Sequence, residues 1–316
     1  MRYSPVRPSS LFLLLLPVLC LALGGCGALG MAALHTANAA SVIGNYQLEH
    51  DLAYGPEPAH RLDVYRPRRG FEGPRPVIVF FHGGDWSEQY PDKDMHKFVG
   101  EALASYGCVA VVANYRRYPS VRFPAFVEDA AGAVVWTRRH IREYGGDPEA
   151  IFLMGHSAGA HIASMVALNE RYLLEAGGDP AWVRGLVGLA GPYSFLPMPD
   201  DPLLKALFGP PQRYPLSQPV NYVDHDAPPM LLLSGARDKR VPTLVMHRLE
   251  RAVRAHGGEV ETRTYRYLDH IMLIGSLAMP VRWSQPVIDD VTAFVHEQAK
   301  RDEPMRTVRA AERRSK

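Results

Sequence analysis

One short motif places a serine where it could act as a nucleophile. Gly155-His156-Ser157-Ala158-Gly159 has the G-x-S-x-G spacing, and it follows the apolar run Ile151–Met154. A tight turn from a buried strand into a helix presents the serine hydroxyl at the positive end of the helix, and flanking glycines remove side chains that would clash. The alternative is a glycine-rich turn with an incidental serine. The predicted strand and helix on either side favour a nucleophile at Ser157.

A serine hydroxyl needs a base to take its proton, and that base needs a partner to orient it. Asp238 follows the apolar run Met230–Ser234, and His270 comes 32 residues later. That interval has room for one helix and one strand. Asp269 is a competing acid, but it adjoins the histidine and in most local geometries points elsewhere. We therefore predict that Ser157, Asp238 and His270 form a catalytic triad.

The same chemistry needs hydrogen-bond donors for a developing oxyanion. His82-Gly83-Gly84-Asp85-Trp86 directly follows a continuous apolar run. Glycines at this point let the backbone approach a substrate and aim N–H groups at the charge. We predict that Gly83, Gly84 and Ala158 donate to the oxyanion.

The elements that must position these residues alternate along the chain. Continuous β-branched and aromatic runs are typical of strands buried on both faces, and between them lie segments with helical periodicity. This alternation predicts an α/β fold with a mostly parallel central sheet and helices on both faces, spanning residues 41–299. The predicted central strands are Val77–Phe81, Cys108–Ala113, Ile151–Met154, Leu186–Ala190 and Met230–Ser234.

Residues 191–229 form one irregular stretch that contains ten prolines. The stretch follows a predicted strand at the edge of the sheet where the site should open, so we interpret it as a cap or lid. The alternative is packing without contact to substrate. Trp86, Tyr193 and Phe195 are the predicted substrate contacts, although aromatic residues here could serve packing alone.

Residues 1–40 have the layout of an export signal. Arg2 and Arg7 precede the apolar run Leu11–Leu23, and small residues follow. Leu23-Gly24-Gly25-Cys26 resembles a bacterial lipobox, which predicts a lipidated Cys26 and attachment to a membrane. A later cut after residues 37–40 would give plain secretion, and an uncleaved membrane anchor is a third alternative. We therefore expect an exported protein that is periplasmic or attached to a membrane as a lipoprotein, or alternatively secreted.

Composition excludes several other classes of protein. The net charge is +2, and seven Lys and Arg lie in residues 300–316, which we interpret as a disordered basic tail. The body is therefore near neutral, which argues against nucleic acid as a partner. Cys108 is the only cysteine outside the signal and lipobox, so no disulfide framework is predicted. Scattered histidines and the lack of a phosphate-binding loop predict neither a metal nor a cofactor.

Taken together, these motifs resemble the α/β-hydrolase superfamily. The nearest branch is the bacterial carboxylesterases related to hormone-sensitive lipase, feruloyl esterases and kynurenine formamidases. The resemblance spans residues 61–295 and includes Asn114-Tyr115-Arg116 and Leu189-Ala190-Gly191-Pro192-Tyr193 besides the motifs above. It departs from the common pattern at Asp85, where many members have a third glycine.

The resemblance implies a serine hydrolase that acts on a small carboxylic ester through an acyl-enzyme. Three alternatives remain open: an aryl formamidase or other amidase, an acyltransferase with the same residues, and a non-catalytic binding protein on the same scaffold. Asp85 resembles the formamidase pattern, which argues against a preference for bulky esters.

Overall fold

The computed structural model describes residues 26–68, 73, 75–279 and 281–301. Residues 1–25 of the predicted export signal (1–40) and residues 302–316 of the predicted tail (300–316) lie outside these ranges. Within the described ranges, no helix is both long and apolar enough to cross a membrane. The described strands are β1 (Tyr46–Ala53), β2 (Arg61–Pro67), β3 (Arg75–Phe81), β4 (Val109–Ala113), β5 (Gly146–His156), β6 (Val183–Leu189), β7 (Met230–Gly235) and β8 (Val260–Tyr265).

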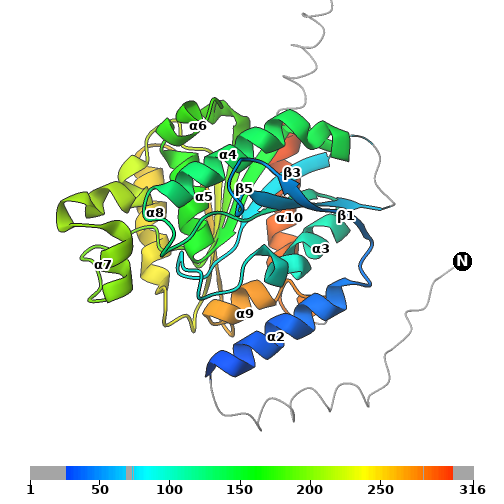
Figure 1. Cartoon of the computed structure of the whole chain (residues 1–316), viewed down its shortest axis with the longest axis horizontal. Coiled ribbons are helices and arrows are strands. Elements are labelled where there is room, and N and C mark those ends of the chain that lie inside the picture. Colours follow the sequence, from blue (N-terminus) through cyan, green and yellow to red (C-terminus); the bar gives the residue numbers. More distant parts are fainter. Residues whose placement is uncertain (1–25, 69–72, 74, 280, 302–316) are drawn as a thin grey trace, which may run out of the picture.

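Helices surround this sheet (Figure 1). The α-helices are α2 (Cys26–Ser41), α3 (Lys97–Ser105), α4 (Ala125–His140), α5 (Ala158–Leu168), α6 (Arg171–Glu175), α7 (Pro202–Phe208), α8 (Thr243–Ala255), α9 (His270–Gly275) and α10 (Val287–Arg301). The 3-10 helices are η1 (Lys93–His96), η2 (Ile141–Tyr144), η3 (Pro180–Trp182), η4 (Pro211–Ser217), η5 (Pro219–Tyr222) and η6 (Arg282–Ser284).

The strands form one sheet in the order β1-β2-β4-β3-β5-β6-β7-β8. β1 and β2 are antiparallel to their neighbours, and the strands from β4 to β8 are parallel. In the register, Phe81 pairs with Gly155, and Gly235 pairs with Tyr265. The carboxyl ends of these strands therefore meet at one edge of the sheet. This architecture confirms the predicted fold class.

Side chains alternate between two apolar layers because successive residues of a strand point to opposite faces. In β3, Val77 and Val79 face the layer of α4, α5 and α8, whereas Ile78 and Phe80 face the layer of α3, α9 and α10. The Pro-rich segment 191–229 joins the first layer through Phe208. Helix α2 joins the second layer through Ala37.

The N-terminal boundary of the folded body differs from the prediction. Residues 26–41 form helix α2, and its residues 34–41 pack on the body, with Ala37 and Ser41 buried. The predicted boundary at residue 41 is therefore the end of a packed helix. At the other end of the domain, α10 extends to Arg301.

Candidate active site

Ser157 occupies a sharp turn between β5 and α5. Its backbone has φ 54° and ψ −121°, a conformation that costs energy for a residue with a side chain. The turn is held by close backbone packing, since a Cβ atom at Gly159 would lie 2.0 Å from the carbonyl oxygen of Phe81. The sequence adopts this turn because glycine stands where no side chain fits. The consequence is a hydroxyl held at the N-terminus of α5, at the edge of the sheet.

The predicted triad residues lie in contact. His270 Nε2 is 2.9 Å from Ser157 Oγ, and His270 Nδ1 is 2.8 Å from Asp238 Oδ2. The three come from the ends of β5, β7 and β8, which the parallel register brings together. All three residues are buried, and Ser157 and His270 lie at the base of a pocket. The arrangement can pass a proton from the hydroxyl to the imidazole.

The surroundings of Asp238 favour its ionised form. Burial opposes ionisation, but His270 and the N–H groups of Val241 and Arg240 donate to the carboxylate and hold its pKa below the usual range. An ionised carboxylate only accepts hydrogen bonds, so Nδ1 of His270 carries the proton and Nε2 is free to accept one. This is the tautomer that a general base beside Ser157 requires.

Asp269, the competing acid, has a different task. Its Oδ1 accepts from the backbone N–H groups of Ile271 and Met272, at 3.0 and 2.8 Å. It is the N-cap of α9, the short helix that begins with His270. Asp269 therefore fixes the backbone that carries the imidazole, whereas Asp238 contacts the ring.

His156 adds a second support for His270. Its Nε2 lies 2.9 Å from the carbonyl oxygen of His270, so the ring donates to that backbone group. Complete burial, together with the nearby ring of His270, holds the pKa of His156 well below its usual value. His156 is a neutral neighbour that positions the base.

The predicted oxyanion donors flank the nucleophile. Within the described residues, the N–H groups of Gly83, Gly84 and Ala158 donate to no protein acceptor. Gly84 has φ +117°, and Asp85 and Trp86 also have positive φ. This loop stores backbone strain while leaving donors free beside Ser157, which is a property expected of an anion-binding turn.

Asp85, where the sequence departs from the common pattern, bridges two loops. Its carboxylate pairs with the guanidinium of Arg240, two residues beyond Asp238. Arg240 also lies over the ring of Tyr90, 6.0 Å from its centroid. The pair ties the glycine loop to the loop that carries the triad acid.

The pocket above the triad encloses about 110 Å³. Four of the predicted site residues line it, namely Ser157, His270, Gly83 and Gly84. Sequence reasoning did not predict the remaining lining residues, which come from α2, η1, β5, α9 and two loops: Leu34, Asp85, Tyr90, Pro91, His96, His156, Arg240, Ile271 and Ile274. One signal in the sequence could have predicted part of this lining. Ile271 and Ile274 follow His270 with the i, i+3 spacing that places two apolar side chains on the same face of a helix.

None of the three predicted substrate contacts lines this pocket. Trp86 is buried, with its ring edge-on to His161 and to Phe208 at 5.1 and 5.2 Å. Tyr193 is buried too, and Phe195 packs against the same apolar layer. Segment 191–229 packs against α5 and α8 through η5, beside the pocket. Tyr193 and Phe208 of this segment are therefore core residues, and Phe195 packs against them from a partly exposed position.

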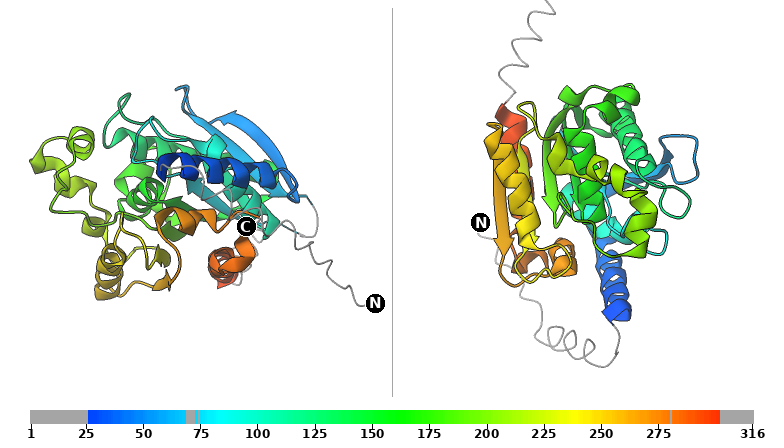
Figure 2. Two further views of the ribbon diagram at one scale, coloured as in Figure 1. Left: turned by 90° about the horizontal axis from the view of Figure 1, so that it is seen from below. Right: turned by 90° about the vertical axis from the view of Figure 1, so that its left-hand side faces the viewer.

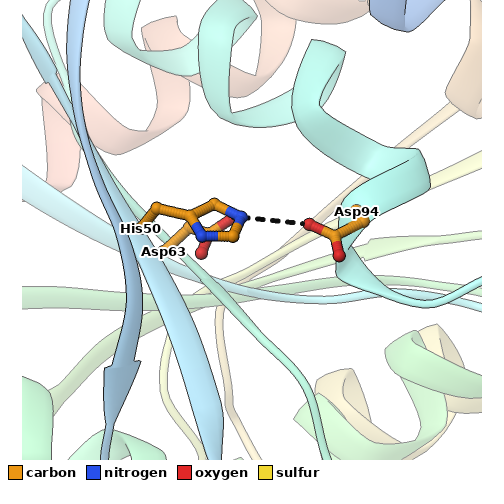
Figure 3. A group of neighbouring side chains, drawn as sticks. All are labelled: His50, Asp63 and Asp94. Atoms are coloured by element: carbon orange, nitrogen blue, oxygen red, sulfur yellow. Dashed lines mark hydrogen bonds and ion pairs between the residues drawn. The ribbon is translucent and has the colours of Figure 1, made fainter.

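One further cluster has the composition of a metal site. A ring nitrogen of His50 and carboxylate oxygens of Asp63 and Asp94 lie within 4.8 Å of one another (Figure 3). The Lys93 ammonium lies 2.8 Å from Asp63 and 2.7 Å from Asp51. Burial opposes its charge, but these carboxylates raise the pKa of Lys93, so it stays protonated. The ammonium supplies the positive charge that the carboxylates need, and the cluster joins β1, β2 and η1 as an ion-pair network.

Known proteins resemble this chain in sequence and in fold. A family model described as BD-FAE matches residues 62–252. The probable carboxylic ester hydrolase LipM of Mycobacterium tuberculosis is 32% identical over 63% of this chain and 50% of its own length. The isoprenylcysteine alpha-carbonyl methylesterase ICME of Arabidopsis thaliana is 28% identical over 79% of this chain and 62% of its own length. The chain thus spans less than two thirds of either relative.

Solved esterases share the architecture. A carbohydrate esterase from gut microbiota superposes with a TM-score of 0.71 at 21% identity, covering 82% of this chain and 98% of the esterase. Esterase B from Lactobacillus rhamnosis gives a TM-score of 0.71 at 19% identity and covers 88% of this chain and 99% of its own. At these identities the similarity establishes the fold.

Proposed function

Because the chain belongs to the BD-FAE family and has the α/β-hydrolase fold, we propose that it hydrolyses small carboxylic esters through Ser157, His270 and Asp238. The observation that carries the proposal is the continuous contact from Ser157 Oγ to His270 to Asp238. That contact gives the serine a base and gives the base a fixed tautomer.

The reaction proceeds in two halves. His270 takes the proton of Ser157 as Oγ attacks the carbonyl carbon, and the N–H groups of Gly83, Gly84 and Ala158 stabilise the oxyanion. His270 then protonates the departing alcohol, leaving an acyl-enzyme. Water, deprotonated by the same imidazole, attacks the acyl-enzyme and releases the acid and Ser157. Asp238 remains ionised and stabilises the imidazolium in both halves.

The size of the pocket supports a small substrate. A dry cavity of about 150 Å³ holds benzene, so about 110 Å³ suits a group of a few carbons. Esters of acetate and butyrate with a good leaving group are therefore the first substrates to test. An amide or formamide would use the same residues, and a matched formanilide in the panel compares the two.

The decisive test compares variants of the full chain. Ser157→Ala should lower kcat for p-nitrophenyl butyrate by at least about 10³-fold and abolish labelling by a fluorophosphonate. Asp238→Asn should lower kcat by about 10⁴-fold, because the amide favours the wrong imidazole tautomer. Asp269→Asn is the matched control, since asparagine also caps a helix. A folded protein that takes no label would instead be a binding protein.

We also propose that the protein is exported and lipidated at Cys26. Support comes from Arg2 and Arg7 before the apolar run Leu11–Leu23 and from Leu23-Gly24-Gly25-Cys26. In a bacterium that processes lipoproteins, the wild type should sediment with membranes, and Cys26→Ala should move to the soluble fraction. Unchanged sedimentation of the variant would contradict lipidation.

A further inference from the structure

Helix α2 is attached to the body by specific contacts. It packs against η1, α3 and α9. Ala37 is 8% exposed and packs in the apolar layer that contains Phe98 and Ile274. Ser41, at the end of the helix, is 1% exposed. A segment with this burial on its inner face is a structural element of the domain.

Asn38 gives α2 a polar anchor. Its Oδ1 accepts from the N–H of Phe98 at 3.2 Å, and its Nδ2 donates to the carbonyl oxygen of Asp94 at 3.0 Å. Phe98 lies in the first turn of α3, where backbone N–H groups have no partner within the helix. His96, the N-cap of α3, provides no side-chain cap. Asn38 therefore supplies from a distance the acceptor that α3 lacks.

Leu34 brings the same helix to the site. It lines the pocket together with Ile271 and Ile274 of α9, and α9 begins with His270. Figure 2 shows α2 (dark blue) lying beside α9, away from the yellow-green segment 191–229. One helix thus both borders the substrate space and packs on the element that carries the base.

We infer that Leu34 sets the size of the substrate pocket, and that residues 34–41 remain part of the mature enzyme. The inference rests on the proposed ester hydrolysis. It distinguishes between the two cleavage sites that the sequence leaves open. Cleavage of the leader before Cys26 keeps all of α2, whereas cleavage after Ala40 removes the helix. The later cut would open the pocket on one side, expose Ile274 and leave the Phe98 N–H without its acceptor.

The first test changes Leu34 in the full chain. Leu34→Phe narrows the pocket, and Leu34→Ala widens it. Two series of esters are compared, one lengthened by single methylenes on the acyl side and one on the alkoxy side. In one of the two series, Leu34→Phe should lower the ratio of kcat/KM for the longer ester to kcat/KM for the shortest ester by about 10-fold. Leu34→Ala should shift that series in the opposite sense. His35→Ala, on the exposed face of the same helix, is the control and should leave every ratio unchanged.

The outcomes separate the two proposals. If the wild type neither cleaves esters nor takes a fluorophosphonate label, the proposed function fails. If the wild type is active but both series keep their ratios in Leu34→Phe and Leu34→Ala, only the inference about Leu34 fails. Thermal melting of each variant shows whether a change in rate reflects lost folding.

The second test reads the mature N-terminus. Mass spectrometry of the chain purified from an exporting bacterium should show that residues 34–41 are present. A mature chain that begins at Ser41 lacks Leu34 and would overturn the inference.

Discussion

Residues 191–229 pack in an apolar layer of the core, whereas helix α2 borders the pocket. Segment 191–229 is rich in proline and aromatic residues and follows a central strand, as a cap would, yet it packs in the layer of α4, α5 and α8. Helix α2 has the sequence expected at the end of a leader, yet its Leu34 lines the pocket above Ser157. The difference shows that a segment close in sequence to the site residues need not line the pocket. What matters is which layer of the sheet a segment joins.

The largest expected effect tests the structural role of segment 191–229. Phe208 is buried against Trp86, Phe123 and Phe195. Phe208→Ala should lower the free energy of unfolding by about 3–5 kcal/mol, because it removes a large buried ring. The ratio of kcat/KM between butyrate and acetate esters should not change. Leu216→Ala, half-exposed in the same segment, is the control for chemical denaturation.

A changed ratio of kcat/KM between butyrate and acetate esters in a folded Phe208→Ala variant would contradict the assignment of segment 191–229 to the core. It would mean that segment 191–229 shapes the substrate space after all.

A smaller effect comes from the histidine that holds this segment. His161 Nε2 donates to the carbonyl oxygen of Ser217 at 2.7 Å, and burial lowers the pKa of His161 to about 4. Unfolded histidine titrates near 6.5, so between these pH values the unfolded state binds the extra proton. Stability should fall as pH drops from about 6.5 to 4, by up to about 3 kcal/mol from this group.

Denaturant midpoints measured across that range check the sign. His161→Gln should flatten the curve by up to about 1.4 kcal/mol per pH unit, because one titrating group is removed. His140→Gln, which removes a histidine from an exposed position, is the control. An equal slope in His161→Gln and wild type would contradict a neutral, buried His161.

The smallest expected effect tests how helix α2 is attached to the body. Asn38→Ala removes the side-chain hydrogen bonds with the Asp94 carbonyl oxygen and the Phe98 N–H, and should cost about 1–2 kcal/mol of stability. Asn38→Asp keeps the acceptor for the Phe98 N–H and should cost less. Chemical denaturation of the two variants gives the order. If Asn38→Ala costs nothing, α2 is held by its apolar contacts alone.

The sequence predicts the frame of the site well, since strand ends follow from local patterns. The buried runs before Gly83, Ser157 and Asp238 predict three strands whose carboxyl ends meet, and the interval to His270 predicts the helix and strand that intervene. These signals are local, and the register of a parallel sheet then places the residues.

The walls of the pocket could not be predicted in this way. Leu34, Tyr90 and Arg240 reach the pocket from segments far apart in the chain, and none stands in a motif that specifies a partner. Trp86 follows Gly83 and Gly84, the proposed oxyanion donors, but its positive φ belongs to a loop that sends the ring into the core. The packing of helices and loops on the sheet decides where these side chains lie, and the sequence pattern carries little information about that packing.

Helix α2 begins at Cys26, eight residues before Leu34. At 1.5 Å per residue, about 12 Å of helix separates the two. An acyl chain carried by Cys26 would hold the mouth of the pocket, with its exposed side chains Tyr90 and Ile271, within a short distance of the lipid surface. Given both the lipidation and the ester hydrolysis proposed above, esters dissolved in the bilayer would reach the pocket at high local concentration, and their location would decide which of them are cleaved as much as their shape.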